Sequence, residues 1–62
     1  MVKRILVVRL LLEDVLKEQP KDLSEAINIM LPRAGYYAWK YECNKEQVID
    51  DTYYHLKEYF SK

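Results

Sequence analysis

The scarcity of turn-forming residues is the feature that most restricts how this chain can fold. Among its 62 residues are one glycine, Gly35, and two prolines, Pro20 and Pro32. Because tight turns rely on glycine and proline, so few of them favour long regular elements over a turn-rich sheet. A chain this short buries only about 60% of the surface that its unfolded form exposes. We therefore predict a single small helical domain over residues 1–62.

Residues 3–18 carry the clearest periodicity. One apolar stripe, with spacings of 3, 4 and 3, consists of Ile5, Val8, Leu12 and Val15. This spacing is typical of one face of a helix. Four more leucines widen the face: Leu6, Leu10, Leu11 and Leu16. A helix this apolar is normally buried on more than one side. We therefore expect a second copy of the chain to cover part of it, along a homodimer seam centred on the stripe.

The charges at the ends of this segment disagree with a helix. Lys3 and Arg4 would lie at the positive end of the helix dipole, and three acidic residues would lie toward its negative end. Each such charge costs about 0.3–1 kcal/mol. That cost is too small to override the periodicity, but it leaves a strand at residues 2–9 as an alternative.

Such a strand would need a second copy of the chain to pair with. A strand followed by two helices and paired as a dimer resembles the ribbon–helix–helix DNA-binding proteins, over about residues 2–31. The resemblance implies paired strands in the major groove and a second helix, here DLSEAINIML, whose N-terminus contacts phosphate. It implies a DNA-binding transcriptional regulator in which Lys3, Arg4 and Arg9 contact DNA.

The rest of the chain reads as further helices. Pro20 ends the first element, because the residue before a proline disfavours helical geometry. Asp22 can cap a new helix, and Glu25, three residues later, can reach back to complete a capping box. We expect this helix to cover residues 23–31. Its buried residues should be Leu23, Ile27, Met30 and Leu31.

Pro32 and Gly35 interrupt the pattern, and the aromatic stretch after them predicts a short third helix or a kinked continuation of the second. Asn44 and Gln47 give a second capping signal, so a last helix should occupy about residues 45–60. Its core stripe should be Ile49, Tyr53, Leu56 and Phe60. The predicted fold is all-α, with three or four helices.

The stretch AGYYAWKYEC holds four of the chain's eight aromatic residues. On a helix, Tyr36 and Trp39 share one face, while Tyr37 and Tyr41 share another. A thin domain can pack one of these stripes but not both, and Tyr54 lies off the core stripe of the last helix. Tyr and Trp bury large areas and dominate binding hot spots. We predict that these five rings form an interface with a protein partner.

Groups suited to catalysis are few. The chain has one histidine, His55, with Asp51 four residues before it, and one cysteine, Cys43. Without a glycine-rich loop or an oxyanion-hole turn, we interpret the Asp–His pair as a surface contact and Cys43 as a small buried apolar residue. The acidic residues do not follow the spacing of a calcium loop. We predict no catalytic residue, no cofactor and no metal.

Charge and hydropathy narrow the class of partner. Ten basic residues cancel ten acidic ones, which argues against broad binding to nucleic acid or anionic lipid. The apolar segments are too short to span a bilayer, and no cleavage site of a secretion signal follows them. We expect a cytoplasmic, non-enzymatic interaction module of the adaptor or inhibitor type. It would bind a larger protein through the Tyr/Trp-rich helical surface.

Overall fold

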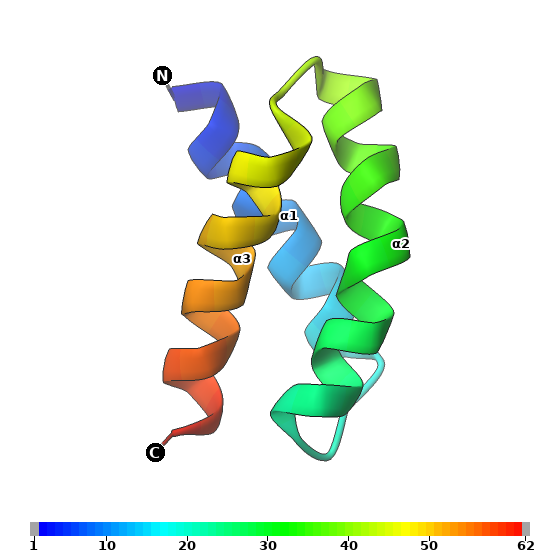
Figure 1. Ribbon diagram of the computed structural model, residues 1–62, viewed down its shortest axis with the longest axis vertical. Coiled ribbons are helices and arrows are strands. Elements are labelled where there is room, and N and C mark those ends of the chain that lie inside the picture. The colour runs from blue at the N-terminus through cyan, green and yellow to red at the C-terminus, as the bar shows by residue number, and fades with distance from the viewer. Residues whose placement is uncertain (1, 62) are drawn as a thin grey trace.

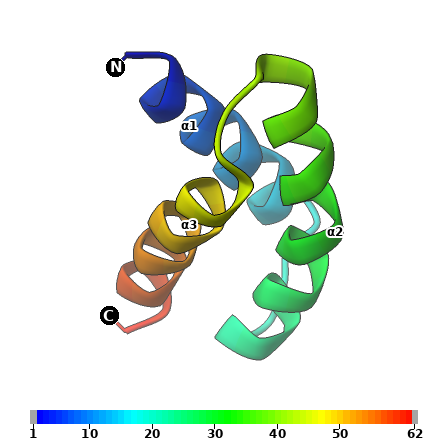
Figure 2. The same cartoon turned by 45° about the horizontal axis from the view of Figure 1, so that its top comes forward.

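Residues 2–61, which the computed structural model describes, form three helices and no strand. These are α1 (Val2–Lys17), α2 (Leu23–Tyr41) and α3 (Lys45–Phe60). In Figure 1, α2 and α3 stand side by side and α1 crosses behind them. Figure 2 shows the same crossing from another side, and each helix contacts both others. The all-α prediction is confirmed.

Residues 2–9 belong to α1 and are helical, so the alternative of a strand there is wrong. Val7, Leu11 and Val15 recur every four residues and are fully buried. A strand would point the side chains of Val7 and Val8 to opposite faces of a sheet, whereas on α1 both are buried in the one helical bundle. The ribbon–helix–helix arrangement therefore lacks its strand here. The unfavourable charge of Arg4 near the start of α1 is offset by an ion pair with Asp51, at 3.0 Å.

The aromatic stretch continues the second helix rather than forming a separate third one, because α2 runs through Pro32 to Tyr41 instead of ending at residue 31. A proline inside a helix leaves the carbonyl four residues earlier, here that of Asn28, without its usual donor. Both residues are exposed, so water can take the place of the missing hydrogen bond. Packing continues on the opposite side of the helix, where buried side chains recur every four residues on both sides of the proline. These are Ala26, Met30, Ala34 and Ala38.

Both predicted helix starts are confirmed. The Asp22 side chain accepts a hydrogen bond from the Glu25 amide at 2.9 Å, and the Glu25 carboxylate accepts one from the Lys21 amide at 2.7 Å. At the start of α3, Asn44 accepts a hydrogen bond from the Gln47 amide at 3.1 Å. The contacts to the Glu25 and Gln47 amides satisfy backbone groups that the first turn of a helix leaves unpaired, while Glu25 reaches back to the residue before the cap.

The core lies where the three helices meet, but α3 presents a different face to it than expected. The buried residues of α3 are Val48, Thr52 and Leu56. Of the expected stripe only Leu56 is buried; Tyr53 is 40% exposed, and Ile49 and Phe60 lie at the edge of the core. The buried face contains the polar residue Thr52, so it does not stand out as an apolar stripe in the sequence.

The buried set on α2 also differs from the prediction. Met30 is buried as expected, whereas Leu23 and Ile27 are half-buried and Leu31 is 44% exposed. The other buried positions on α2 are alanines, Ala26, Ala34 and Ala38. Within the described residues, none of the helices combines the length and apolar character needed to cross a membrane.

Candidate protein-binding surface

The aromatic residues of α2 divide between two faces of the helix. Tyr37 and Tyr41 are half-buried and pack against the core. Trp39 and Tyr36 point away from it, with 77% and 53% of their surface exposed. The expectation that the domain can pack only one of the two stripes is met. We call Tyr36, Trp39 and the adjoining Lys40 the outer aromatic surface.

The side chains of the outer aromatic surface lie against one another. The ring centres of Tyr36 and Trp39 are 6.3 Å apart, with the planes tilted by 41°. The ammonium group of Lys40 lies 5.7 Å from the ring centre of Tyr36 and 5.6 Å from that of Tyr41. Such cation–π contacts are worth about 0.5–1 kcal/mol at exposed sites. The surface thus combines two large rings with one positive charge.

The inner rings are held by α1. The Tyr37 hydroxyl donates a hydrogen bond to the Asp14 carboxylate at 3.1 Å, and Arg33 pairs with the same carboxylate at 3.3 Å. Burial, the hydrogen bond to Asp14 and the charge of that carboxylate raise the pKa of Tyr37 above its usual value. Tyr41 stacks parallel to Tyr37, with ring centres 6.4 Å apart. Of these two predicted interface rings, Tyr37 therefore joins α2 to α1, and Tyr41 packs against Tyr37 and the core.

Tyr54 lies apart from the α2 rings. It is 59% exposed and packs edge-on against His55, with ring centres 5.6 Å apart. Among residues 2–61, no aromatic pair joins Tyr54 to α2. The structure thus brings Tyr36 and Trp39 together and separates Tyr54 from them. The sequence reasoning did not single out Tyr59, which is 54% exposed beside Phe60 near the end of α3.

The expected Asp51–His55 contact is wrong, because the Asp51 carboxylate pairs with Arg4 of α1 instead. His55 is exposed on α3. Cys43 is half-buried rather than buried, and its thiol donates to the Tyr41 carbonyl at 3.6 Å. Over residues 2–61, no three His, Cys, Asp or Glu side chains are grouped so as to hold a metal ion.

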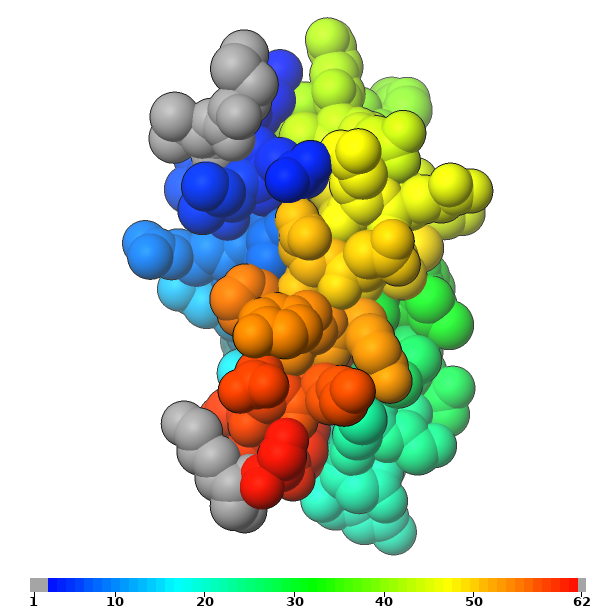
Figure 3. All heavy atoms as spheres, turned by 60° about the vertical axis from the view of Figure 1, so that its left-hand side comes forward, coloured from blue at the N-terminus to red at the C-terminus, as the bar shows by residue number. Residues whose placement is uncertain are grey.

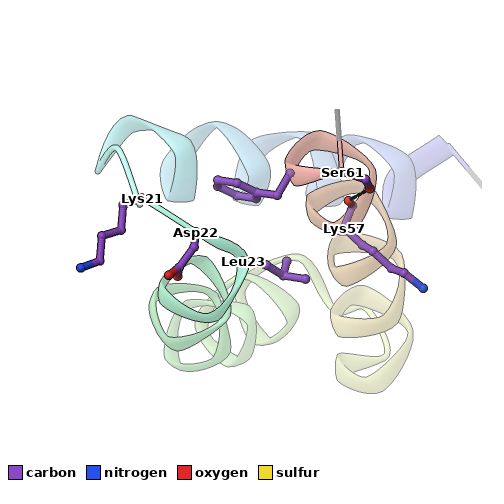
Figure 4. Close-up of a pocket in the computed structure, with 6 residues that line it drawn as sticks. Lys21, Asp22, Leu23, Lys57 and Ser61 are labelled. Carbon is purple, nitrogen blue, oxygen red and sulfur yellow. Dashed lines mark hydrogen bonds between the residues drawn. The ribbon is translucent and has the colours of Figure 1, made fainter.

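An open notch of about 370 Å³ lies between the start of α2 and the end of α3. Figure 4 shows that the lysine side chains of Lys21 and Lys57 extend away from each other there. The Ser61 hydroxyl donates to the Lys57 carbonyl, within its own turn. Polar groups that bind a small molecule converge on it. The notch lacks such convergence, and the outer aromatic surface is the stronger candidate site.

Comparison with known protein families, with curated proteins and with solved structures finds no match for this chain.

Proposed function

We propose that the chain is a small non-enzymatic interaction module, of the adaptor or inhibitor type, that binds a larger protein through the outer aromatic surface. The observation that carries the proposal is the 77% exposure of Trp39, the chain's only tryptophan, beside Tyr36. A buried tryptophan removes about 150–250 Å² from water, which is worth roughly 4–6 kcal/mol before the costs of binding. In the isolated chain most of that gain is unused.

The helix that carries the outer aromatic surface is already fixed in place before binding. The residues of this surface lie on a continuous helix that Tyr37, Asp14 and Arg33 fix to α1. Lys40 restrains the Tyr36 ring from one side. Ordering a side chain at an interface costs about 0.5–1.5 kcal/mol, and part of that cost is already met here. The chemistry of the surface fits an apolar pocket for Trp39 with carboxylates at its rim near Lys40.

The test begins with a photo-crosslinking amino acid at Lys40, followed by identification and purification of the protein it captures. Binding of that purified protein is then measured by the fluorescence of Trp39, which should shift to shorter wavelength as the ring leaves water. Trp39→Ala and Tyr36→Ala should each weaken the affinity by roughly tenfold or more. The affinity of Trp39→Ala is measured by calorimetry, because this variant lacks the tryptophan whose fluorescence reports binding.

Tyr59→Ala is the matched control, because Tyr59 and Tyr36 are exposed to almost the same extent, at 54% and 53%. It should bind as the wild type does. The proposal fails if the Trp39 emission is unchanged at saturation, or if Tyr36→Ala and Tyr59→Ala weaken binding equally.

A further inference from the structure

The side of α1 that faces away from the core carries a short periodic pattern, separate from the outer aromatic surface. Leu6, Arg9, Glu13 and Leu16 follow at spacings of 3, 4 and 3, so they form one line along the helix. Leu6 is 51% exposed, Arg9 and Glu13 are exposed, and Leu16 is half-buried, with part of its side chain packed against the edge of the core. We call these four residues the α1 stripe. Its ends are apolar and its middle holds two opposite charges.

The two charges are not paired within the chain. The ion pairs among residues 2–61 connect α1 to α2 and α3 through other side chains, and neither Arg9 nor Glu13 takes part in them. A charged group that lies exposed on an apolar face can be satisfied by the opposite charge on a partner. An antiparallel copy of the same helix offers that charge at the matching position.

The surface beside the stripe adds apolar area to it. Ile5, 66% exposed, borders a shallow groove of about 220 Å³ between α1 and α3. Figure 3 looks onto the face where these two helices, blue and yellow to orange, lie side by side. The groove is lined by Ile5, Val8, Arg9, Leu12, Asp51 and His55. Ile5 and Leu6 thus extend the apolar area on both sides of Arg9.

We propose that the α1 stripe binds a second copy of this chain, with the two α1 helices antiparallel. In the register that sets Arg9 opposite Glu13 of the second copy, the two-fold axis repeats the same pair in reverse. That register also sets Leu6 opposite Leu16 of the second copy, again twice. A parallel pair would place Arg9 against Arg9 and Glu13 against Glu13, which is repulsive. The charge pattern therefore selects the antiparallel orientation.

In this arrangement the homodimer seam lies on a different face of α1 from the one predicted from the sequence. Val8 is 4% exposed and Val15 is fully buried, so neither can lie at a surface between copies. Ile5 and Leu12 remain at its edge. A helix of 16 residues is about 24 Å long, and one such helix per copy makes an interface at the small end of the known range. The dimer should therefore be reversible, forming as the protein concentration rises.

Sedimentation equilibrium over rising concentrations of the purified chain tests the proposal. Arg9→Glu sets two carboxylates opposite each other, and Glu13→Arg sets two guanidinium groups opposite each other. Each single variant should weaken self-association by roughly tenfold or more. An equimolar mixture of the two variants restores both pairs, so it should form a heterodimer. The double variant with both changes in one chain should self-associate like the wild type.

A matched pair of variants separates this interface from general stickiness. Leu6→Glu should abolish self-association, whereas Leu31→Glu, at a leucine of similar exposure on α2, should leave it unchanged. Circular dichroism verifies that each variant keeps its helicity. Trp39→Ala should also leave self-association unchanged, because the two proposals use different helices.

Three results would overturn the inference. The first is that the chain stays monomeric at every concentration up to ~1 mM, because a dissociation constant above that value is too weak to assign to a specific dimer. The second is wild-type self-association in both single charge variants, which would also be the result for a parallel pair. The third is a mixture of the two variants that stays monomeric.

Discussion

The two faces of α2 carry the same kinds of residue and use them differently. On the inner face, Tyr37 packs against the core and donates its hydroxyl to Asp14 of α1. On the outer face, Tyr36 and Trp39 lie mostly in water. Tyr36 and Tyr37 are adjacent in the sequence. Composition is thus no guide to whether an aromatic ring stabilises the fold or remains available to a partner; the neighbouring helix makes that difference.

The largest effect should come from removing an inner ring and comparing it with an outer one. Tyr37→Ala should lower the free energy of unfolding by about 2 kcal/mol, because it removes a packed ring and its hydrogen bond to Asp14. Tyr36→Ala should change it by less than about 0.5 kcal/mol. Urea unfolding followed by circular dichroism measures both. Equal losses would show that the two faces contribute alike.

The inner hydroxyl can be tested alone with Tyr37→Phe. At neutral pH this variant should lose about 1 kcal/mol, the usual worth of one hydrogen bond, and it leaves the Asp14 carboxylate paired with Arg33. Because folding raises the pKa of Tyr37, its contribution is fully present below pH 10 and is lost as the pH rises through the raised value.

The difference in stability between the wild type and Tyr37→Phe should therefore shrink as the pH increases above 10. Unfolding curves at several alkaline pH values measure this difference, and the other tyrosines cancel because both chains contain them. A difference that stays constant or grows would contradict the raised pKa.

The hydroxyl of Thr52 should have the opposite effect on stability from that of Tyr37 when it is removed. Thr52 is fully buried in the core, and its hydroxyl has no hydrogen-bond partner among the described residues. Thr52→Val keeps the shape of the side chain and removes the unsatisfied group, so it should raise the free energy of unfolding by up to about 1 kcal/mol. In a domain this small that corresponds to a rise of roughly 4–8 °C in Tm, measured by thermal unfolding. A lower Tm would mean that the hydroxyl is satisfied in solution.

Local signals in the sequence were sufficient to place the helix starts. Asp22 with Glu25, and Asn44 with Gln47, act within four residues of each other, so their geometry does not depend on the rest of the fold. The spacing of apolar residues in α1 predicted the helix but not its buried face, because Ile5 of the predicted stripe is 66% exposed while Val7 and Leu11 lie in the core. For the candidate site, the sequence separated the two aromatic faces of α2 correctly.

The features that could not be predicted from the sequence depend on how the helices pack. The helix α2 continues through Pro32 because Asn28 faces water on the outer side of the bundle. Which side of α2 faces water depends on the positions of α1 and α3. The face that α3 buries, and the partition of tyrosines between core and solvent, also follow from those positions. Periodicity fixes which residues share a face of a helix. Only the contacts between helices decide which of those faces is covered and which is left for another molecule.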